Sequence, residues 1–528
     1  MQQITQKVEN SAIEPYTGKR RIADNTMLNF FSRALLIPIG LISIPAIVNG
    51  MGPERFGLFS LAWVLLSYFS ILDLGFSQAI TKFIATEINQ NRHHNITQIF
   101  WTATLVLTLF GLILCVTLLI LTPWIVSDVL KTPNQLSDEA IRMFQILAFA
   151  IPFIFISNAF RGALEAGQRF DLVNAIRTPY TASIYLLPLI GYFIGWEVDK
   201  LTGFLFLSVF LSFSAYMIMS KKVYPKIFSE IKLKRGLIQS IFGYSGWIAV
   251  SNFVAPILVY LDRFIITATL TLSVLAYYSA PYEALTRLWF IPLSITATLF
   301  PAFSGNSLFE KQEDTLLLFS SSMKYLLLIL GPITILIFIF SQEILQIWIG
   351  PEYAENSNYV TKILILGIFI NSLGRLQATL FYGRGRPDIP AKLHLIELPF
   401  YIILLIILLR NWGINGAALA WTLRVVVDTF LLFIYSNHLN AISLKKLFNK
   451  RLLIASLILV GLLFVGVLIR IIGKDVSVYY QLITLLFAMI IAGVVFWFTV
   501  LEDYEKSFLI EFISRINSVK QIIFNRMG

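Results

Sequence analysis

Ten charged side chains lie inside long apolar stretches of this 528-residue chain. An arginine at the middle of a bilayer costs about 2.5 to 3.5 kcal/mol, so these residues are expected to face water or protein rather than lipid. Arginine outnumbers carboxylate by six to four, and its planar fork suits phosphate oxygens, so the pattern favours a cavity that binds an anion. The ten residues are Arg33, Arg177, Arg263, Arg287, Arg375, Arg424, Asp262, Glu283, Glu397 and Asp428.

Two pairs among these charges also have a structural explanation. Glu283 precedes Arg287 by four residues, and Arg424 precedes Asp428 by the same interval. Residues four apart share one face of a helix, where opposite charges can neutralise each other. The sequence alone leaves neutralisation and a cavity role open for each pair.

The other arginines differ in their expected depth. Arg177 and Arg375 lie within about two turns of the expected ends of their apolar stretches, where an arginine can extend its charge to the membrane surface. Arg33 lies deeper and has no local partner, so a cavity position is the favoured interpretation. Asp73 is expected to end a helix at the interface.

The elements that position these residues follow from the composition. The chain is 57% hydrophobic and 13% charged, with a mean hydropathy of +0.76, which is typical of a polytopic membrane protein. About 20 apolar residues cross the hydrocarbon layer as a helix, and the apolar runs here have 18 to 26 residues. The fold class is therefore predicted to be all-α, with about fourteen transmembrane helices.

The spans fall into a predicted domain order. A cytoplasmic segment (1–24) precedes a first lobe of six spans (25–222), a basic linker (223–238), a second lobe of six spans (239–440), two further spans (441–500) and an amphipathic cytoplasmic tail (501–528). The first apolar run, near 25–48, is too long for the core of a signal peptide, so we interpret it as a retained span. The spans are expected near residues 25–48, 56–74, 97–122, 139–160, 172–194, 201–220, 239–269, 274–303, 316–340, 358–382, 391–409, 414–437, 451–472 and 478–500.

The distribution of basic residues predicts the orientation. With the N-terminus in the cytoplasm, 27 of the 41 lysines and arginines fall on the cytoplasmic side and 7 in outer loops. Both termini are therefore expected to be cytoplasmic. Because the net charge of +11 is concentrated in the loops between spans, it indicates topology rather than nucleic-acid binding.

An internal repeat is indicated at a shift of 219 residues. The segment FGLFSLAWVLL (56–66) then aligns with LAYYSAPYEAL (275–285), so that Ser60 matches Ser279. Phe59 and Trp63 of the first segment also fall on Tyr278 and Tyr282 of the second. Chance likeness between apolar helices is the alternative.

A second region supports the repeat at a similar shift. The segment EAGQRFD (165–171) corresponds to YGRGRPD (382–388), and each precedes a proline-containing helix. Six spans return the chain to the same side of the membrane, so the two lobes are expected to be related by a pseudo-twofold axis along the membrane normal. Rocking of such lobes would give alternating access to a central cavity.

Signals for catalysis are weak. The sequence has no GxxxxGK[ST] phosphate-binding loop, its four histidines are scattered without cysteines or carboxylates at metal spacing, and its one cysteine, Cys115, lies within an apolar run. The longest outer loop, near 123–138, is too short for a catalytic domain. We expect a transporter rather than an enzyme, with no cofactor and no metal.

Three segments resemble a known family. GMGPERFGLFSLA (50–62), LDLGFSQAITKF (72–83) and LDRF (261–264) resemble the polysaccharide transporter branch of the multidrug/oligosaccharidyl-lipid/polysaccharide exporter superfamily, the Wzx-type flippases of O-antigen and capsule repeat units. Asn49 and Met51 stand where many members have a basic residue shortly before the turn, which puts a charge role there in doubt.

The resemblance implies a function and a site. A flippase of this type moves an undecaprenyl-diphosphate-linked oligosaccharide across the bacterial inner membrane, with membrane lipids and other polysaccharide-assembly proteins as candidate partners and no nucleic acid. The cationic lumen of the family would correspond here to Arg33, Arg263, Arg287 and Arg424, with Asp262 as a companion carboxylate. Arg375 is a further candidate for substrate binding because it lies within a span.

Two other functions compete with this one. A multidrug or organic-cation exporter of the same superfamily is expected to place carboxylates in its first lobe, whereas the first span here offers Arg33. A membrane polysaccharide polymerase or ligase would need a substantial outer loop with catalytic residues. The short outer loops favour transport.

Overall fold

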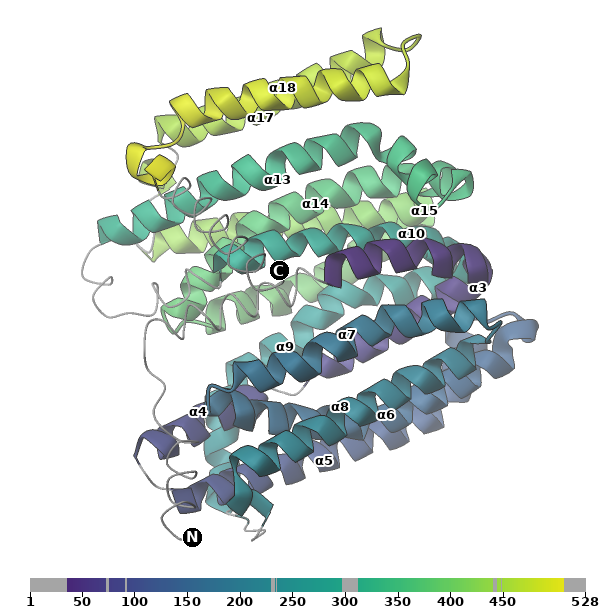
Figure 1. Cartoon of the computed structure of the whole chain (residues 1–528), viewed down its shortest axis with the longest axis vertical. Coiled ribbons are helices and arrows are strands. Elements are labelled where there is room, and N and C mark those ends of the chain that lie inside the picture. The colour runs from purple at the N-terminus through teal and green to yellow at the C-terminus, as the bar shows by residue number, and fades with distance from the viewer. Residues whose placement is uncertain are drawn as a thin grey trace, which may run out of the picture. The chain divides into compact units, whose positions relative to one another are not determined.

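The structure is a computed structural model that describes residues 36–72, 76–90, 93–228, 233, 235–296, 312–439, 444–447 and 449–507. These residues form helices and no strand, which confirms the predicted all-α class (Figure 1). The longer helices are α3 (Leu36–Ile71), α4 (Phe76–Asn89), α5 (His93–Trp124), α6 (Asn134–Ala166), α7 (Phe170–Phe193), α8 (Val198–Val223), α9 (Arg235–Thr269), α10 (Leu272–Leu285), α13 (Gln312–Trp348), α14 (Pro351–Gly383), α15 (Asp388–His438), α17 (Lys450–Ile472) and α18 (Val478–Thr499). Short elements are η1 (Ile125–Val129), η2 (Pro225–Phe228), η3 (Thr286–Trp289) and α16 (Leu444–Leu447).

The apolar helices identify a multi-pass membrane protein. Nine helices within the described ranges are long and apolar enough to cross a membrane. Two of them contain a break where the sequence predicts a turn between spans: Gly52 in α3 has a φ of 74°, and Gly413 in α15 has a φ of 56°. Both values lie in the left-handed region that glycine adopts without steric cost. The total of fourteen spans stays a prediction.

Several predicted features fall outside the described residues. These are Arg33, Asp73 and most of the tail, of which only 501–507 is described. The described residues divide between two compact units: unit 1 lies within 36–290, 345–360 and 386–424, and unit 2 lies within 291–344, 361–385 and 425–507. The lobe boundaries at 25–222 and 239–440 rest on the repeat and stay a prediction.

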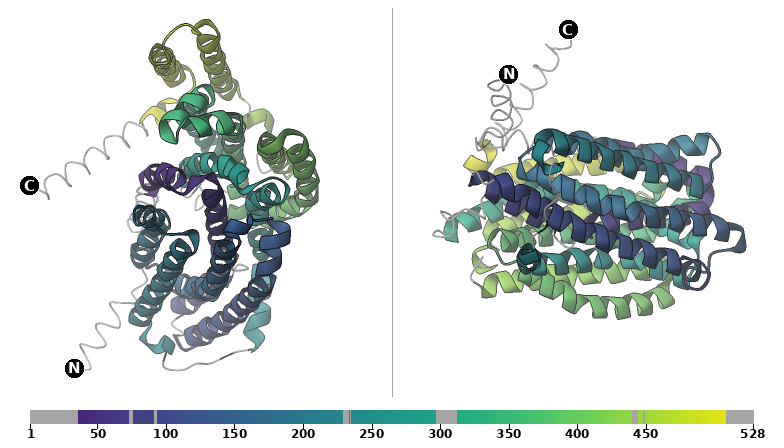
Figure 2. Two further views of the ribbon diagram at one scale, coloured as in Figure 1. Left: turned by 90° about the vertical axis from the view of Figure 1, so that its right-hand side faces the viewer. Right: turned by 90° about the horizontal axis from the view of Figure 1, so that it is seen from below.

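Unit 1 is built from long helices that lie side by side. Helix α6 packs against α5 and α8, and α3 packs against α7 and α10, with the long axes of neighbouring helices running in similar directions (Figure 2). The crossing of α3 and α10 is close, because a Cβ added to Gly57 would lie 2.0 Å from the carbonyl oxygen of Leu272. The absence of a side chain at Gly57 therefore permits this approach.

The crossing of α3 and α10 brings two repeat-related residues together. The hydroxyls of Ser60 and Ser279 are hydrogen-bonded at 3.3 Å, and these residues are separated by the predicted shift of 219. A residue that contacts its own repeat equivalent lies at the axis that relates the two copies. The contact therefore supports the repeat.

The second repeat region also forms matching local structures. Arg169 donates through Nε and Nη2 to both oxygens of Asp171, at 3.0 and 2.8 Å. Arg386 makes the same two contacts with Asp388, at 2.8 and 3.1 Å. The residue before each arginine is in the left-handed region, with φ of 55° and 66°. Equivalent turns with equivalent ion pairs agree with the duplication predicted from sequence.

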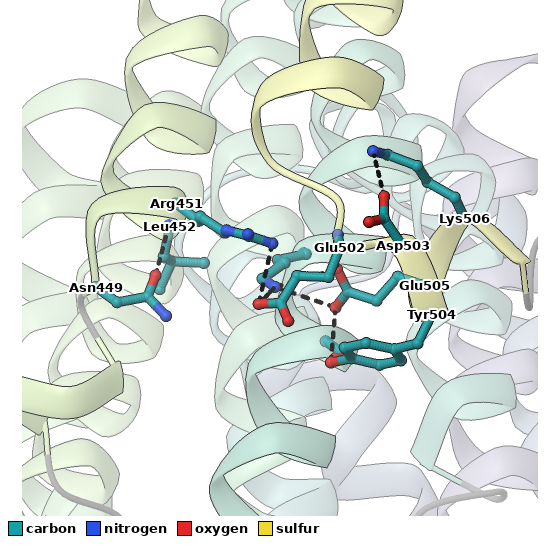
Figure 3. A network of polar contacts seen from close by, with 10 residues as sticks. Asn449, Arg451, Leu452, Glu502, Asp503, Tyr504, Glu505 and Lys506 are labelled. Carbon is teal, nitrogen blue, oxygen red and sulfur yellow. Dashed lines mark hydrogen bonds and ion pairs between the residues drawn. The ribbon is translucent and has the colours of Figure 1, made fainter.

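In unit 2, the hairpin of α17 and α18 is fixed to α13 near both of its ends. At one end, Lys324 of α13 lies 3.1 Å from Glu505, in the network that Figure 3 shows around Glu502 and Glu505. At the other end, Arg470 of α17 lies 2.6 Å from Glu343 of α13. Nineteen residues separate the two α13 positions, which corresponds to about 28 Å of helix. Between them the three helices share an apolar cluster that includes Ile339.

Candidate functional site

The hairpin of α9 and α10 positions the first part of the site. Helix α9 ends at Thr269, and the side chain of Thr271 caps α10 by accepting from the Val274 amide at 3.3 Å. Because the two helices reverse direction here, residues at similar distances from the turn lie at similar depth. Asp262 and Tyr278 each lie eight residues from residue 270, and their side chains are in contact.

Asp262 and Arg263 are completely buried in this hairpin. The Asp262 carboxylate accepts from the Tyr278 hydroxyl at 2.5 Å and from the Arg263 amide at 2.8 Å. The Arg263 guanidinium lies 3.5 Å from Asp262 and 3.6 Å from Glu283, with its Cζ 4.2 Å from the centroid of the Tyr282 ring. Arg263 is thus enclosed by two carboxylates and an aromatic face, and its side chain has no exposed surface.

Helix α15 is broken at Gly413 into two arms, and a second ion pair joins one arm to the other. Nη1 of Arg424 lies 3.6 Å from Oε2 of Glu397, and both side chains are less than a tenth exposed. The ring of Tyr401 lies 5.7 Å from the Arg424 Cζ. Trp421 packs edge-on against Tyr282 at 5.7 Å, which joins this pair to the α9–α10 hairpin.

Arg287 has a different environment from the other two arginines. It lies in the 3₁₀ turn η3 after α10, and its Cζ is 4.3 Å from the centroid of the Tyr185 ring of α7. It also lies against the backbone of α3, where a Cβ on Gly40 would be 3.0 Å from Cζ and Nη2. Within the described ranges, no carboxylate lies at ion-pair distance from Arg287.

These residues form what we call the charged cluster: Asp262, Arg263, Glu283, Arg287, Glu397 and Arg424. The cluster holds three arginines and three carboxylates, so its formal charge is zero (3 − 3). The two-charge excess predicted from the sequence therefore comes from the other four residues, Arg33, Arg177 and Arg375 against Asp428 (3 − 1).

Packing replaces the i, i+4 neighbour of Glu283 and gives Arg424 a partner other than its own i, i+4 neighbour. Glu283 pairs with Arg263 on the neighbouring helix, not with Arg287 one turn away, and Arg424 pairs with Glu397 on the other arm of α15. Arg375 of α14 belongs to unit 2, where its Nε donates to Asn371 at 2.9 Å.

Buried hydrogen-bond donors gather around the charged cluster. Seven donor atoms in this region are buried and have no hydrogen-bond partner within the described part of the chain. Such groups are rare in folded proteins and indicate water or a ligand. They are Nε and Nη2 of Arg263, Nη2 of Arg287, Nε of Arg424, the hydroxyls of Tyr282 and Tyr401, and Nε1 of Trp421.

The aromatic lining is the part of the site that sequence reasoning missed. Tyr185, Tyr278, Tyr282, Tyr401 and Trp421 surround the arginines, and none was singled out as a site residue. One signal was present, because the repeat aligned Tyr278 and Tyr282 with the aromatic residues of 56–66. That alignment says nothing about Tyr185, which reaches the site only through the packing of α7.

A multi-pass helical bundle with a charged, donor-rich cluster inside its apolar helices has the features of a membrane transporter. The comparisons with known proteins agree. Residues 22–307 match the model of a family described as "Polysaccharide biosynthesis protein". The chain belongs to this family, and the resemblance found in the sequence is confirmed.

A curated relative supports the same assignment, and two solved structures share the fold. The chain is 30% identical over 414 residues to a protein named "Putative O-antigen transporter" from Shigella flexneri, covering 78% of this chain and 96% of that protein. The fold of this chain is similar to that of "Lipid II flippase MurJ, inward closed conformation", with a TM-score of 0.68 and 15% identity. The match covers 89% of this chain and 97% of that structure. A multidrug resistance MATE family transporter of the MOP superfamily gives a TM-score of 0.65 at 14% identity, with coverage of 78% and 98%.

Proposed function

We propose that this protein is a flippase that moves an undecaprenyl-diphosphate-linked oligosaccharide from the cytoplasmic to the periplasmic leaflet of the bacterial inner membrane. Alternating access between two six-helix lobes, with both termini in the cytoplasm, would carry the headgroup across. The observation that carries the proposal is the group of seven unsatisfied buried donors at the charged cluster. Phosphate and sugar oxygens are acceptors, so the headgroup supplies what these donors lack.

Arg287 is the residue assigned to the diphosphate. Its Nη2 lacks a hydrogen-bond partner within the described ranges, and its positive charge has no carboxylate partner there. A phosphate oxygen would provide both. Arginine presents two parallel N–H groups to such an anion, which lysine cannot do.

Arg424 and Arg263 are assigned a secondary role. Their ion-pair distances of 3.5 to 3.6 Å are longer than the roughly 2.7 to 2.9 Å of a good charge-assisted hydrogen bond. A phosphate oxygen could therefore approach these arginines without displacing a short hydrogen bond to a carboxylate. Arg33 and Arg375 remain candidates for contacts elsewhere along the transport path.

The test is complementation of a strain that lacks its own repeat-unit flippase. Replacement of Arg287 or Arg424 by alanine should abolish surface polysaccharide while the protein remains at its normal level in the membrane. Arg410→Ala is the matched control, because Arg410 lies on the same helix as Arg424 but is exposed. Normal polysaccharide from both the Arg287 and Arg424 variants would overturn the proposal.

A further inference from the structure

Gly40 of α3, Tyr185 of α7 and Arg287 meet within unit 1. The Tyr185 ring lies 4.3 Å from the Arg287 Cζ, which is within the range of a cation–π contact. A Cβ on Gly40 would lie 3.0 Å from Cζ and Nη2 and 3.4 Å from Nε. The guanidinium is thus in contact with a ring on one neighbouring helix and with bare backbone on another.

The glycine at position 40 is explained by this contact and not by the backbone. Gly40 is helical, and its φ lies outside the left-handed region, so the backbone there accepts any side chain. Alanine is the better helix former, which makes a glycine unfavourable unless space is needed. The space at Gly40 is taken by the Arg287 guanidinium.

The ring of Tyr185 is itself held in place. Trp63 of α3 packs against it at a centroid distance of 5.3 Å, and the Trp63 indole donates to the carbonyl of Ile184 at 3.2 Å. Tyr185 is only 8% exposed, so its ring has little freedom to turn. A fixed ring gives the guanidinium a fixed plane.

We propose that Gly40 and Tyr185 are positioning residues that orient the planar guanidinium of Arg287 for bidentate binding of the phosphate oxygens of a diphosphate lipid. This inference rests on the proposed function. Glu283, one turn before Arg287, is engaged by Arg263 at 3.6 Å, so the orientation of Arg287 comes from the ring and the glycine instead of a carboxylate. An unpaired, oriented arginine keeps its charge and its Nη2 donors for the ligand.

The positioning residues also belong to a different predicted lobe from the arginine. Gly40 and Tyr185 lie in the first lobe (25–222), whereas Arg287 lies in the second (239–440). The phosphate contact is therefore complete only when the two lobes adopt an arrangement that brings these three residues together. Diphosphate binding would thereby be coupled to the conformational cycle.

Four variants separate positioning from folding. Gly40→Ala adds a methyl group against the guanidinium in a helix that alanine favours, so it should perturb Arg287 without lowering the melting temperature. Tyr185→Leu removes the ring, whereas Tyr185→Phe keeps it. Gly203→Ala is the matched control, because Gly203 is also helical but a Cβ there would have nothing within 4 Å.

The experiment measures binding of farnesyl diphosphate to the purified full-length protein in detergent by thermophoresis. Tyr185→Leu should raise the Kd about 5- to 30-fold, the range for loss of a partly to fully desolvated cation–π contact. Gly40→Ala should also raise the Kd, beyond the spread of the control, because the added methyl group displaces the guanidinium. Gly203→Ala should stay within about twofold of the wild type, and Tyr185→Phe, which keeps the ring but loses the hydroxyl, should bind more tightly than Tyr185→Leu. Farnesyl monophosphate should show a smaller effect of the same variants, because it offers fewer oxygens for a bidentate contact.

Two results distinguish the failure of this inference from failure of the proposed function. If Arg287→Ala abolishes binding but Gly40→Ala and Tyr185→Leu bind like the wild type, the positioning role is overturned and the proposed function stands. If Arg287→Ala binds farnesyl diphosphate like the wild type, the assignment of Arg287 to the diphosphate is overturned. A uniform loss of binding that includes Gly203→Ala would also overturn the positioning role, because it would not depend on contact with Arg287.

Discussion

Replacement of Lys324 by methionine tests how the α17–α18 hairpin is attached to α13. The Lys324 side chain is 2% exposed, and its Nζ donates to both oxygens of Glu505 at 3.1 and 3.2 Å. A third carboxylate oxygen, from Glu502, lies 3.6 Å away. Methionine keeps the length and apolar stem of lysine, so the substitution removes the charge with little change in packing.

The expected loss of stability depends on which ion-pair partners Glu502 and Glu505 keep after the substitution. Glu502 retains Arg451 at 3.1 Å and is partly exposed, whereas the completely buried Glu505 loses its ion-pair partner (Figure 3). Breaking a buried pair on one side costs about 3 to 5 kcal/mol. Glu505→Gln should cost less, about 1.5 to 3 kcal/mol, because Lys324 keeps its ion pair with Glu502. The double variant should cost less than the sum, since a neutral glutamine needs no cation.

The assay is thermal unfolding of the purified full-length protein in detergent, followed by intrinsic fluorescence. For a chain of 528 residues, 1 kcal/mol corresponds to about 1 °C, so Lys324→Met should lower the melting temperature by about 3 to 5 °C. Lys200→Met is the control, because the Lys200 side chain is 58% exposed and pairs with Glu197 at the surface. An unchanged melting temperature in Lys324→Met, or strict additivity in the double variant, would refute the reasoning.

Two further predictions concern unit 1. Cysteines in place of Ser60 and Ser279, in a Cys115→Ser background, should form a disulfide on mild oxidation because the two hydroxyls are 3.3 Å apart. The cross-link should block polysaccharide export until a reductant is added. A failure to cross-link, measured by mass spectrometry, would contradict the predicted axial contact. The Arg169 guanidinium lowers the pKa of the Asp171 carboxyl below its usual range, so the stabilisation from this pair is complete above about pH 4 and is lost only as the pH falls below it. Asp171→Asn should therefore lower the melting temperature equally at pH 6 and pH 8, and a loss that differs between these two values would count against the pair as its cause.

The sequence was sufficient for the class of protein and for much of the order of its helices. Hydropathy is summed over about 20 residues, so a membrane helix gives a strong signal even when single residues are ambiguous. The turns at Gly52 and Gly413 were predictable because glycine interrupts the apolar pattern where the chain reverses. The repeat was visible through short motifs, and its clearest support is the contact between Ser60 and Ser279.

The site was predicted only in part. Asp262, Arg263, Arg287 and Arg424 could be named because a charge within an apolar helix is conspicuous in any sequence. Their surroundings could not, because tyrosine is common in membrane helices and its position gives no sign of which arginine it contacts. Gly40 is the extreme case, since a glycine in an apolar run carries no chemical signal until the neighbouring side chain is known.

By itself, the sequence determined that the chain is a multi-pass helical membrane protein of the polysaccharide biosynthesis family with charges inside its spans. Only the tertiary structure decided which charges are neutralised. Spacing along one helix offered Glu283 to Arg287, but the crossing of α9 and α10 brings Glu283 to Arg263. An ion pair forms with the charge that packing brings closest, and packing between helices is not encoded in the spacing along either one. That choice leaves Arg287 between Gly40 and Tyr185 with its charge available.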